Sequence, residues 1–216
     1  MQITIREPGS AITHFIGMML AVFASVPLLI KSGLGTGGVC FAAMGIFMLS
    51  MILLYGASTT YHAVNVSAKA LKIFRKIDHM MIFVMIAGSY TPVCLIVLGG
   101  RSGMLLLALV WGIALLGMGI NLLWINCPKW FSSAVYIALG WVCVLVFRQL
   151  LSVLSTGAFL WLLAGGIIYT IGGIVYALKL PIFNSRHANF GSHEIFHLFV
   201  MGGSICHFIF MYGYVA

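Results

Sequence analysis

The sequence contains very few charged residues, and acidic residues are the scarcest of them. Asp, Glu, Lys and Arg make up 6% of its 216 residues, and the acidic ones are Glu7, Asp78 and Glu194. About a quarter of the residues of an average soluble domain are charged, so this chain cannot cover a soluble surface of its size. A hydrophobic content of 62% and a mean hydropathy of +1.15 indicate an integral membrane protein instead.

Further absences narrow the class of membrane protein. The apolar residues form long unbroken runs rather than alternating stretches of about ten residues, which argues against a transmembrane barrel and favours helices. The N-terminus, MQITIREPGSAITH, lacks a cleavable signal-peptide pattern, so we expect the first apolar segment to be retained as a span. The five cysteines include no C-x-x-C pair, which is typical of packing residues rather than of a disulfide or metal site.

Polar residues, glycines and prolines divide the chain into apolar segments that are each long enough to cross a bilayer. The connections between them are short and leave no room for a second domain. The sequence therefore predicts an all-α integral membrane protein, a single seven-helix domain over residues 1–216. Its spans are expected at about 12–31, 38–63, 77–98, 103–125, 131–150, 157–178 and 191–213.

The distribution of Lys and Arg predicts the orientation. With a cytoplasmic N-terminus, eight basic residues fall on inside segments and three on outside ends. This asymmetry predicts that the N-terminus is inside and the C-terminus outside. The net charge of +8 is then topology information, not a sign of nucleic-acid binding, and we expect the stretch Lys69–Lys76 to lie along the anionic inner leaflet. The inside residues are Arg6, Lys69, Lys72, Arg75, Lys76, Lys129, Lys179 and Arg186, and the outside ones Lys31, Arg101 and Arg148.

The predicted topology brings several polar residues to the cytoplasmic ends of three spans. Ser58 and His62 end the second span, Asp78 begins the third, and His193 and His197 begin the seventh. Polar and ionisable side chains at membrane depth are costly and tend to mark functional sites. These five residues are therefore the candidate site.

Three of the five residues are suited to hold a metal ion. His193 and His197 are four residues apart and share one helix face, and His62 is the best third imidazole. Imidazole ligands favour zinc, while ligand type alone leaves iron, nickel and copper open. Three protein ligands leave a fourth position for water, as in catalytic zinc sites.

Asp78 and Ser58 have two interpretations each. Asp78 either binds the metal directly or, as we prefer, hydrogen-bonds the metal-bound water and acts as general base. Ser58 lies one turn before His62, so its hydroxyl can reach a water, a ligand or a substrate carbonyl. The alternative for Ser58 is a hydrogen bond to its own helix backbone.

The remaining polar residues are expected to play structural roles. Glu194 belongs to an H-E-x-x-x-H pattern and is expected to snorkel or to form an ion pair. His14 either joins the cluster or, as we prefer, caps the interface. His79 points about 100° away from Asp78, and His207 lies about 15 Å deeper than His197, as a polar contact of the core.

Proline and glycine also punctuate the apolar segments. Pro92 in IAGSYTP is expected to kink the third span unless a neighbouring hydroxyl compensates for the lost backbone hydrogen bond. The glycines of GGIIYTIGG and MGGSI allow helices to approach closely.

Together these motifs resemble the hemolysin III family. The resemblance covers nearly the whole chain and rests on ITHFIG, ASTTYH, D-H with IAGSYTP, and H-x-x-x-H followed by GGSICHF. That family is the bacterial branch of the progestin and adipoQ receptor superfamily, which includes the adiponectin receptors. The resemblance implies a seven-helix fold with a cytoplasmic N-terminus, and a zinc ion held by His62, His193 and His197. It also implies that Asp78 reaches the zinc through water and that Ser58 is the serine of the same pattern.

The wider superfamily is similar to alkaline ceramidases, which implies zinc-dependent hydrolysis of a lipid amide or ester. Our leading hypothesis is therefore a bacterial inner-membrane zinc hydrolase with Asp78 and Ser58 as catalytic residues and membrane lipids as partners. The alternative is a receptor-like or regulatory membrane protein in which zinc is structural. A cytolytic pore has less support, since the ionisable residues gather at one face, and a transporter would require matched broken helices that the spans do not show.

Overall fold

The computed structural model describes residues 5–35, 37–124, 127–178 and 191–216, and these contain helices but no strand. Seven helical segments are long and apolar enough to cross a membrane, which confirms the predicted fold class. Four are α1 (Pro8–Gly35), α2 (Gly38–Ala63), α4 (Gly100–Leu123) and α7 (Thr156–Leu178). The other three are composite: α3 (Ala68–Pro92) with η1 (Val93–Leu98), α5 (Lys129–Gly140) with η2 (Trp141–Val146) and α6 (Phe147–Val153), and α9 (Ser192–Phe210) with η3 (Met211–Val215).

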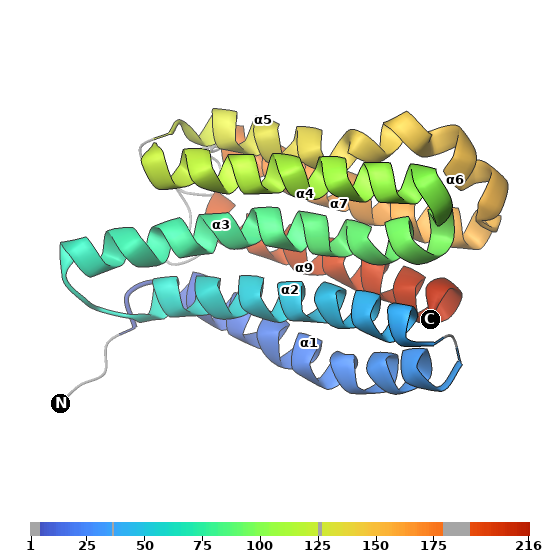
Figure 1. Ribbon diagram of the computed structural model, residues 1–216. Coiled ribbons are helices and arrows are strands. Elements are labelled where there is room, and N and C mark those ends of the chain that lie inside the picture. Colours follow the sequence, from blue (N-terminus) through green and yellow to red (C-terminus); the bar gives the residue numbers. More distant parts are fainter. Residues whose placement is uncertain (1–4, 36, 125–126, 179–190) are drawn as a thin grey trace.

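The spans run roughly parallel to one another in Figure 1, and the contacts between them close into a ring. Each span packs on its neighbour along the chain, and α1 closes the ring by packing on α9. One end of the bundle therefore collects the start of α1, the end of α2, the start of α3 and the start of α9. The helix ends that carry the five candidate residues thus lie at the same end of the bundle.

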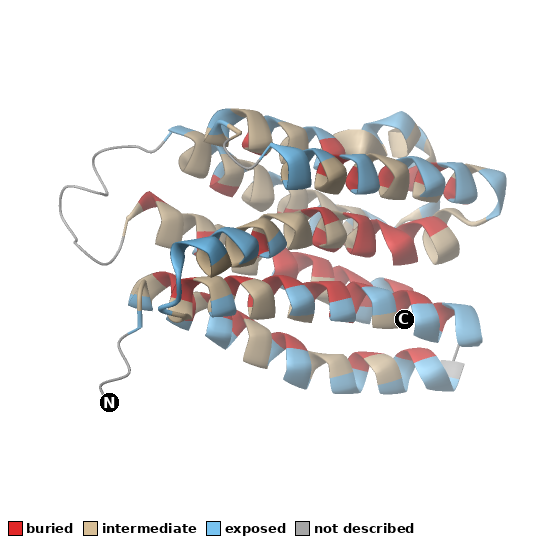
Figure 2. Cartoon of the chain, turned by 60° about the vertical axis from the view of Figure 1, so that its left-hand side comes forward, coloured by how far each residue is buried: buried red, intermediate tan, exposed pale blue. Residues whose placement is uncertain are grey.

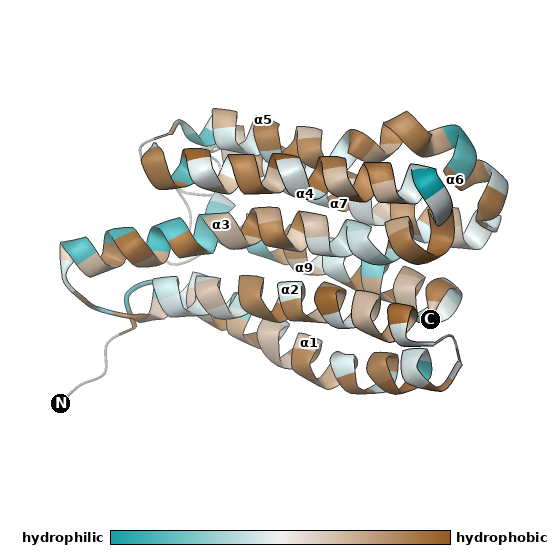
Figure 3. Ribbon diagram, viewed as in Figure 1, coloured by the Kyte–Doolittle hydropathy of each residue, from teal (hydrophilic) through white to brown (hydrophobic). Residues whose placement is uncertain are grey.

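Burial follows the pattern of a membrane protein. Figure 2 shows buried and exposed residues alternating along most helices, as expected where one face of a helix packs on its neighbours. Large apolar side chains such as Phe23, Leu34 and Leu116 are at least 70% exposed. Such an apolar exterior suits lipid, because lipid tails do not penalise it as water does. Hydrophilic colour gathers at the start of α3 in Figure 3, where Lys69 and Lys72 are exposed.

Two spans begin earlier than their hydropathy suggests. The third helix starts at Ala68 rather than near residue 77, because the Ser67 hydroxyl accepts a hydrogen bond from the Ala70 N–H and caps it. The basic stretch Lys69–Lys76 is thus part of the helix. The first helix starts at Pro8, a residue favoured in the first helical turn because its missing N–H would have no partner there. Lys179, Arg186 and His187 lie outside the described residues.

Three spans change helix type along their length, and in the seventh α9 ends in the π-helix η3. After Pro92 the third span continues as the π-helix η1, while the Ser89 and Thr91 hydroxyls donate to the carbonyls of Ile86 and Ala87. In the fifth span the 3-10 segment η2 follows Gly140. The Tyr90 hydroxyl bridges this break, since it donates to the Gly140 carbonyl at 2.6 Å and accepts from the Cys143 N–H at 2.9 Å. All five cysteines are free.

Candidate metal centre

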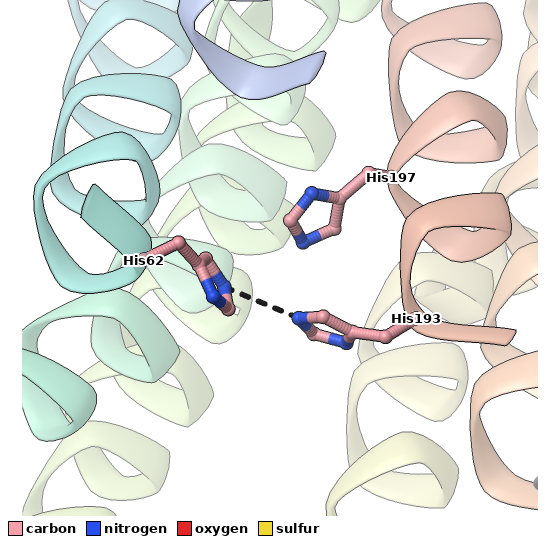
Figure 4. Close-up of side chains that lie close together, drawn as sticks. All are labelled: His62, His193 and His197. Atoms are coloured by element: carbon pink, nitrogen blue, oxygen red, sulfur yellow. Dashed lines mark hydrogen bonds between the residues drawn. The ribbon is translucent and has the colours of Figure 1, made fainter. Parts of the chain in front are cut away.

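His62, His193 and His197 converge at the shared end of the bundle. One ligand nitrogen from each lies within 4.8 Å of the others, and the Nε2 atoms of His62 and His193 are 3.1 Å apart. Figure 4 shows His62 reaching from α2 and the other two from α9 toward one point. His62 and His197 are buried, and His193 is partly buried.

Glu7 fixes the orientation of His62. The Glu7 carboxylate accepts a short hydrogen bond from Nδ1 of His62, so Nε2 keeps its lone pair and faces the other two histidines. The backbone supports this contact, because the N–H of Glu7 donates to the His62 carbonyl at 3.0 Å. Arg6 adds a 3.5 Å ion pair with Glu7 and a 2.7 Å hydrogen bond to the Tyr61 carbonyl.

His197 is oriented by α1. Its Nδ1 lies 3.2 Å from the Thr13 hydroxyl, whose own hydrogen is directed at the carbonyls of Gly9 and Ser10. Nδ1 must therefore be the donor in this pair, which leaves the Nε2 lone pair of His197 for the centre. The His14 ring stacks on His197 with a centroid distance of 3.5 Å and an interplanar angle of 9°. His14 thus packs against the site in the interior rather than capping the interface.

The donor set fits a zinc ion. Zinc binds imidazole nitrogens at about 2.0–2.1 Å in tetrahedral geometry, which places two such nitrogens about 3.3 Å apart. The observed 3.1 Å between the Nε2 atoms of His62 and His193 is close to this spacing. Each of His62 and His197 has its Nδ1 engaged by a hydrogen-bond partner outside the triad, which leaves the Nε2 lone pair for the centre, the usual arrangement of zinc-binding imidazoles.

Asp78 and Ser58 lie beside the histidines. Both are buried and line, together with His193 and His197, a cavity of about 160 Å³. The Ser58 hydroxyl interacts with the Asp78 carboxyl. Among the described residues, Asp78 is not one of the group whose ligand atoms lie within 4.8 Å of one another. This position suits a carboxylate that acts through a water better than one that binds the metal.

Glu194 has a capping role that sequence reasoning did not predict. Its carboxylate accepts hydrogen bonds from the Ser10 hydroxyl at 2.5 Å and the Gly191 N–H at 2.7 Å. It thereby caps the start of α9 and ties it to α1. The physical reason is local: a carboxylate three residues into a helix satisfies backbone donors that have no helical partner.

The roles of Glu7 and Thr13 were missed by sequence reasoning. Glu7 contacts His62 of α2, 55 residues away in the sequence, and Thr13 contacts His197 of α9, 184 residues away. The scarcity of acidic residues was the available signal, since all three of them lie at the cytoplasmic ends of the predicted spans. His79 stays outside the group of three histidines, as expected, and its carbonyl accepts from the Tyr136 hydroxyl.

Comparison with known proteins gives one family. Its sequence profile, described as "Haemolysin-III related", matches residues 2–208. The chain is 37% identical over 213 residues to "Hemolysin-3" of Bacillus cereus, covering 97% of this chain and 92% of that protein. It is also 37% identical over 206 residues to the "Hemolysin-3 homolog" of Bacillus subtilis (strain 168), at 95% and 92% coverage. The "Adiponectin receptor protein" of Drosophila melanogaster is 22% identical over 222 residues, 94% of this chain but 49% of that protein.

Proposed function

Since this chain belongs to the haemolysin-III-related family and gathers three imidazoles beside an internal cavity, we propose that it is a zinc-dependent membrane hydrolase of lipid amides or esters. The observation that carries the proposal is that a buried carboxylate, Asp78, lines one cavity with two members of a three-histidine donor set, His193 and His197. A purely structural zinc site needs no such carboxylate, whereas hydrolysis needs a base.

His62, His193 and His197 would hold the metal. When bound, zinc supplies a Lewis acid that polarises a carbonyl oxygen and acidifies a water. Asp78 accepts the proton of the attacking water and returns it to the leaving amine or alcohol. Ser58 donates to the Asp78 carboxylate and keeps it in place. Once Asp78 has taken the proton, it can donate to the Ser58 oxygen, and the single hydrogen of Ser58 is then available to the carbonyl oxygen of the substrate.

The cavity supports a lipid-like substrate. Its walls between the triad and the interior include Leu54, Ile82, Met85 and Ile86, which suit a hydrocarbon chain. Its charged lining residues are Arg75, Asp78 and Lys129, all near the starts of α3 and α5, at the same end of the bundle as the triad. The reacting group therefore belongs at this polar end and the apolar chain in the interior.

The direct test is fatty-acid release by purified protein in lipid nanodiscs, followed by mass spectrometry on ceramides, other N-acyl amides and acyl esters. We expect release that stops when zinc is chelated and returns when zinc is added. Asp78→Asn should keep its zinc and lose roughly 10²–10⁴-fold in rate. No release from any of these lipids by zinc-loaded wild type, or full activity of Asp78→Asn, would sink the proposal.

A structural metal is the second candidate, and the contacts around the triad favour it as an alternative. The three histidines and their partners Glu7 and Thr13 link α1 and α2, at the start of the chain, to α9 near its end. In this case chelation would lower the thermal stability of the protein, and no substrate would be turned over.

A further inference from the structure

His207 is a buried imidazole with unused hydrogen-bonding capacity. It lies on α9 ten residues after His197, which corresponds to about 15 Å along the helix. It is 9% exposed, and neither ring nitrogen has a hydrogen bond with a described residue. The backbone of Leu162 interacts with the ring, so at least one nitrogen is left without a hydrogen-bond partner. A buried polar group without a partner is costly, and native proteins usually give it a water or a ligand.

The neighbouring helix makes room for this ring. A Cβ atom at Gly165 of α7 would overlap Cδ2 and Nε2 of His207, so a side chain at Gly165 would displace the imidazole. The Tyr169 ring is accommodated in the same way by Gly203 of α9. The two rings then meet edge to face at 5.3 Å. The contact between α7 and α9 thus leaves room for the His207 imidazole, although an apolar side chain would pack there without burying a polar group.

The other polar groups nearby are already satisfied. The hydroxyls of Tyr55 and Tyr169 both bond to the Ser204 hydroxyl, at 2.7 and 2.8 Å. The Trp141 indole N–H donates to Thr170 at 2.9 Å. Among the described aromatic side chains that line both the cavity at the triad and a second cavity beyond it, His207 is therefore the one with a free polar atom.

His207 stands where two cavities meet. The cavity that begins at the triad reaches it, and a second cavity of about 70 Å³ lies beyond. No described charged residue lines the second cavity, so its polar ligand group should be neutral. The residues that line both cavities are Ser89, Tyr90, Gly140, Trp141, Gly166 and His207.

We propose that His207 is the recognition contact for a hydroxyl group on an acyl chain that lies in these cavities with its carbonyl end at the histidine triad. The position of the carbonyl end rests on the proposed function. An extended chain advances roughly 1.2 Å per bond, so about 15 Å corresponds to about twelve bonds. The structure thus favours a mid-chain hydroxyl, which can donate to the free ring nitrogen, over a plain acyl chain.

The test is competition binding in phosphatidylcholine nanodiscs with tritiated 12-hydroxystearate. Stearate and 2-hydroxystearate serve as competitors that lack a hydroxyl or carry it at the wrong depth. We expect unlabelled 12-hydroxystearate to compete at least tenfold more strongly than either. His207→Leu should remove this preference and leave stearate binding unchanged, while His207→Gln, which can still accept a hydrogen bond, should keep part of it.

Equal competition by all three acids, retention of the preference in His207→Leu, or no binding of any chain would overturn the proposal. A protein that shows the preference but hydrolyses no lipid would contradict the proposed reaction and leave the His207 site standing.

Discussion

Residues of α1 and its N-terminal flank control the orientation of the histidine triad. Glu7 holds Nδ1 of His62, Thr13 holds Nδ1 of His197, and His14 stacks on the His197 ring. A hydrogen-bonded carboxylate behind an imidazole fixes its tautomer and increases its basicity, which strengthens metal binding. The first span therefore contributes to the centre without supplying a ligand.

Loss of the Glu7 carboxylate should weaken metal binding. We expect Glu7→Ala to bind zinc roughly 10–100-fold more weakly than wild type, because His62 loses the group that orients it. Competition with a chromophoric chelator measures the change. Glu7→Gln is the matched control, since its amide oxygen still accepts from Nδ1 and should limit the loss. Wild-type affinity in Glu7→Ala would show that the carboxylate does not support the centre.

At the scale of the helices, close packing depends on small residues where two helices meet. Gly88 of α3 faces Ser50 of α2 so closely that an added Cβ atom would overlap both side-chain atoms of the serine. Ser50 cannot move away cheaply, because its hydroxyl donates to the Phe47 carbonyl at 2.7 Å. Gly112 of α4, by contrast, has no atom within 4 Å of an added Cβ. The two glycines therefore form a matched pair for a packing test.

Gly88→Ala should destabilise the protein by roughly 1–3 kcal/mol, because α2 and α3 must move apart. Gly112→Ala should be neutral or slightly stabilising, since alanine is the better helix former and the site is open. Unfolding of both variants in mild detergent, followed by circular dichroism, compares them. Equal stability of the two variants would mean that the α2–α3 contact is looser than described.

The sequence predicts features that a local pattern encodes, but not those that depend on contacts between different spans. The seven helices follow from hydropathy, and the pairing of His193 with His197 follows from helical spacing, because both patterns are local. The change to a 3-10 helix at Trp141 could not be predicted, because no proline precedes it in the sequence. The break is bridged by Tyr90, which belongs to another span. The Glu7 contact with His62 likewise depends on how α1 packs, which no local pattern encodes.

The bundle as a whole has a polar end and an apolar body. The exposed lysines at the start of α3 lie at the same end as the triad, where Lys76 also donates to the Leu122 carbonyl at the end of α4. We propose that this end faces the cytoplasm of a bacterial cell, with the chain in the inner membrane and membrane lipids around it. Anionic lipids of the inner leaflet would attract its basic side chains.

Reporter fusions test this orientation. Alkaline phosphatase fused after Ala216 should be active and a green fluorescent protein fused there should be dark, because the C-terminus is expected outside. Fusions in the connection between α2 and α3 should give the opposite result and serve as the control. A fluorescent C-terminal fusion with an inactive phosphatase fusion would reverse the topology and place the triad at the outer face.

The measurement that tests the central claim most directly is the metal content of detergent-purified protein by mass spectrometry. It compares wild type with His62→Ala and with the double variant His193→Ala, His197→Ala. We predict about one zinc per chain in wild type and its loss in both variants, because three imidazoles from two helices are needed to hold it. Wild-type protein without metal, or variants that keep it, would contradict the zinc centre and with it the proposed hydrolase.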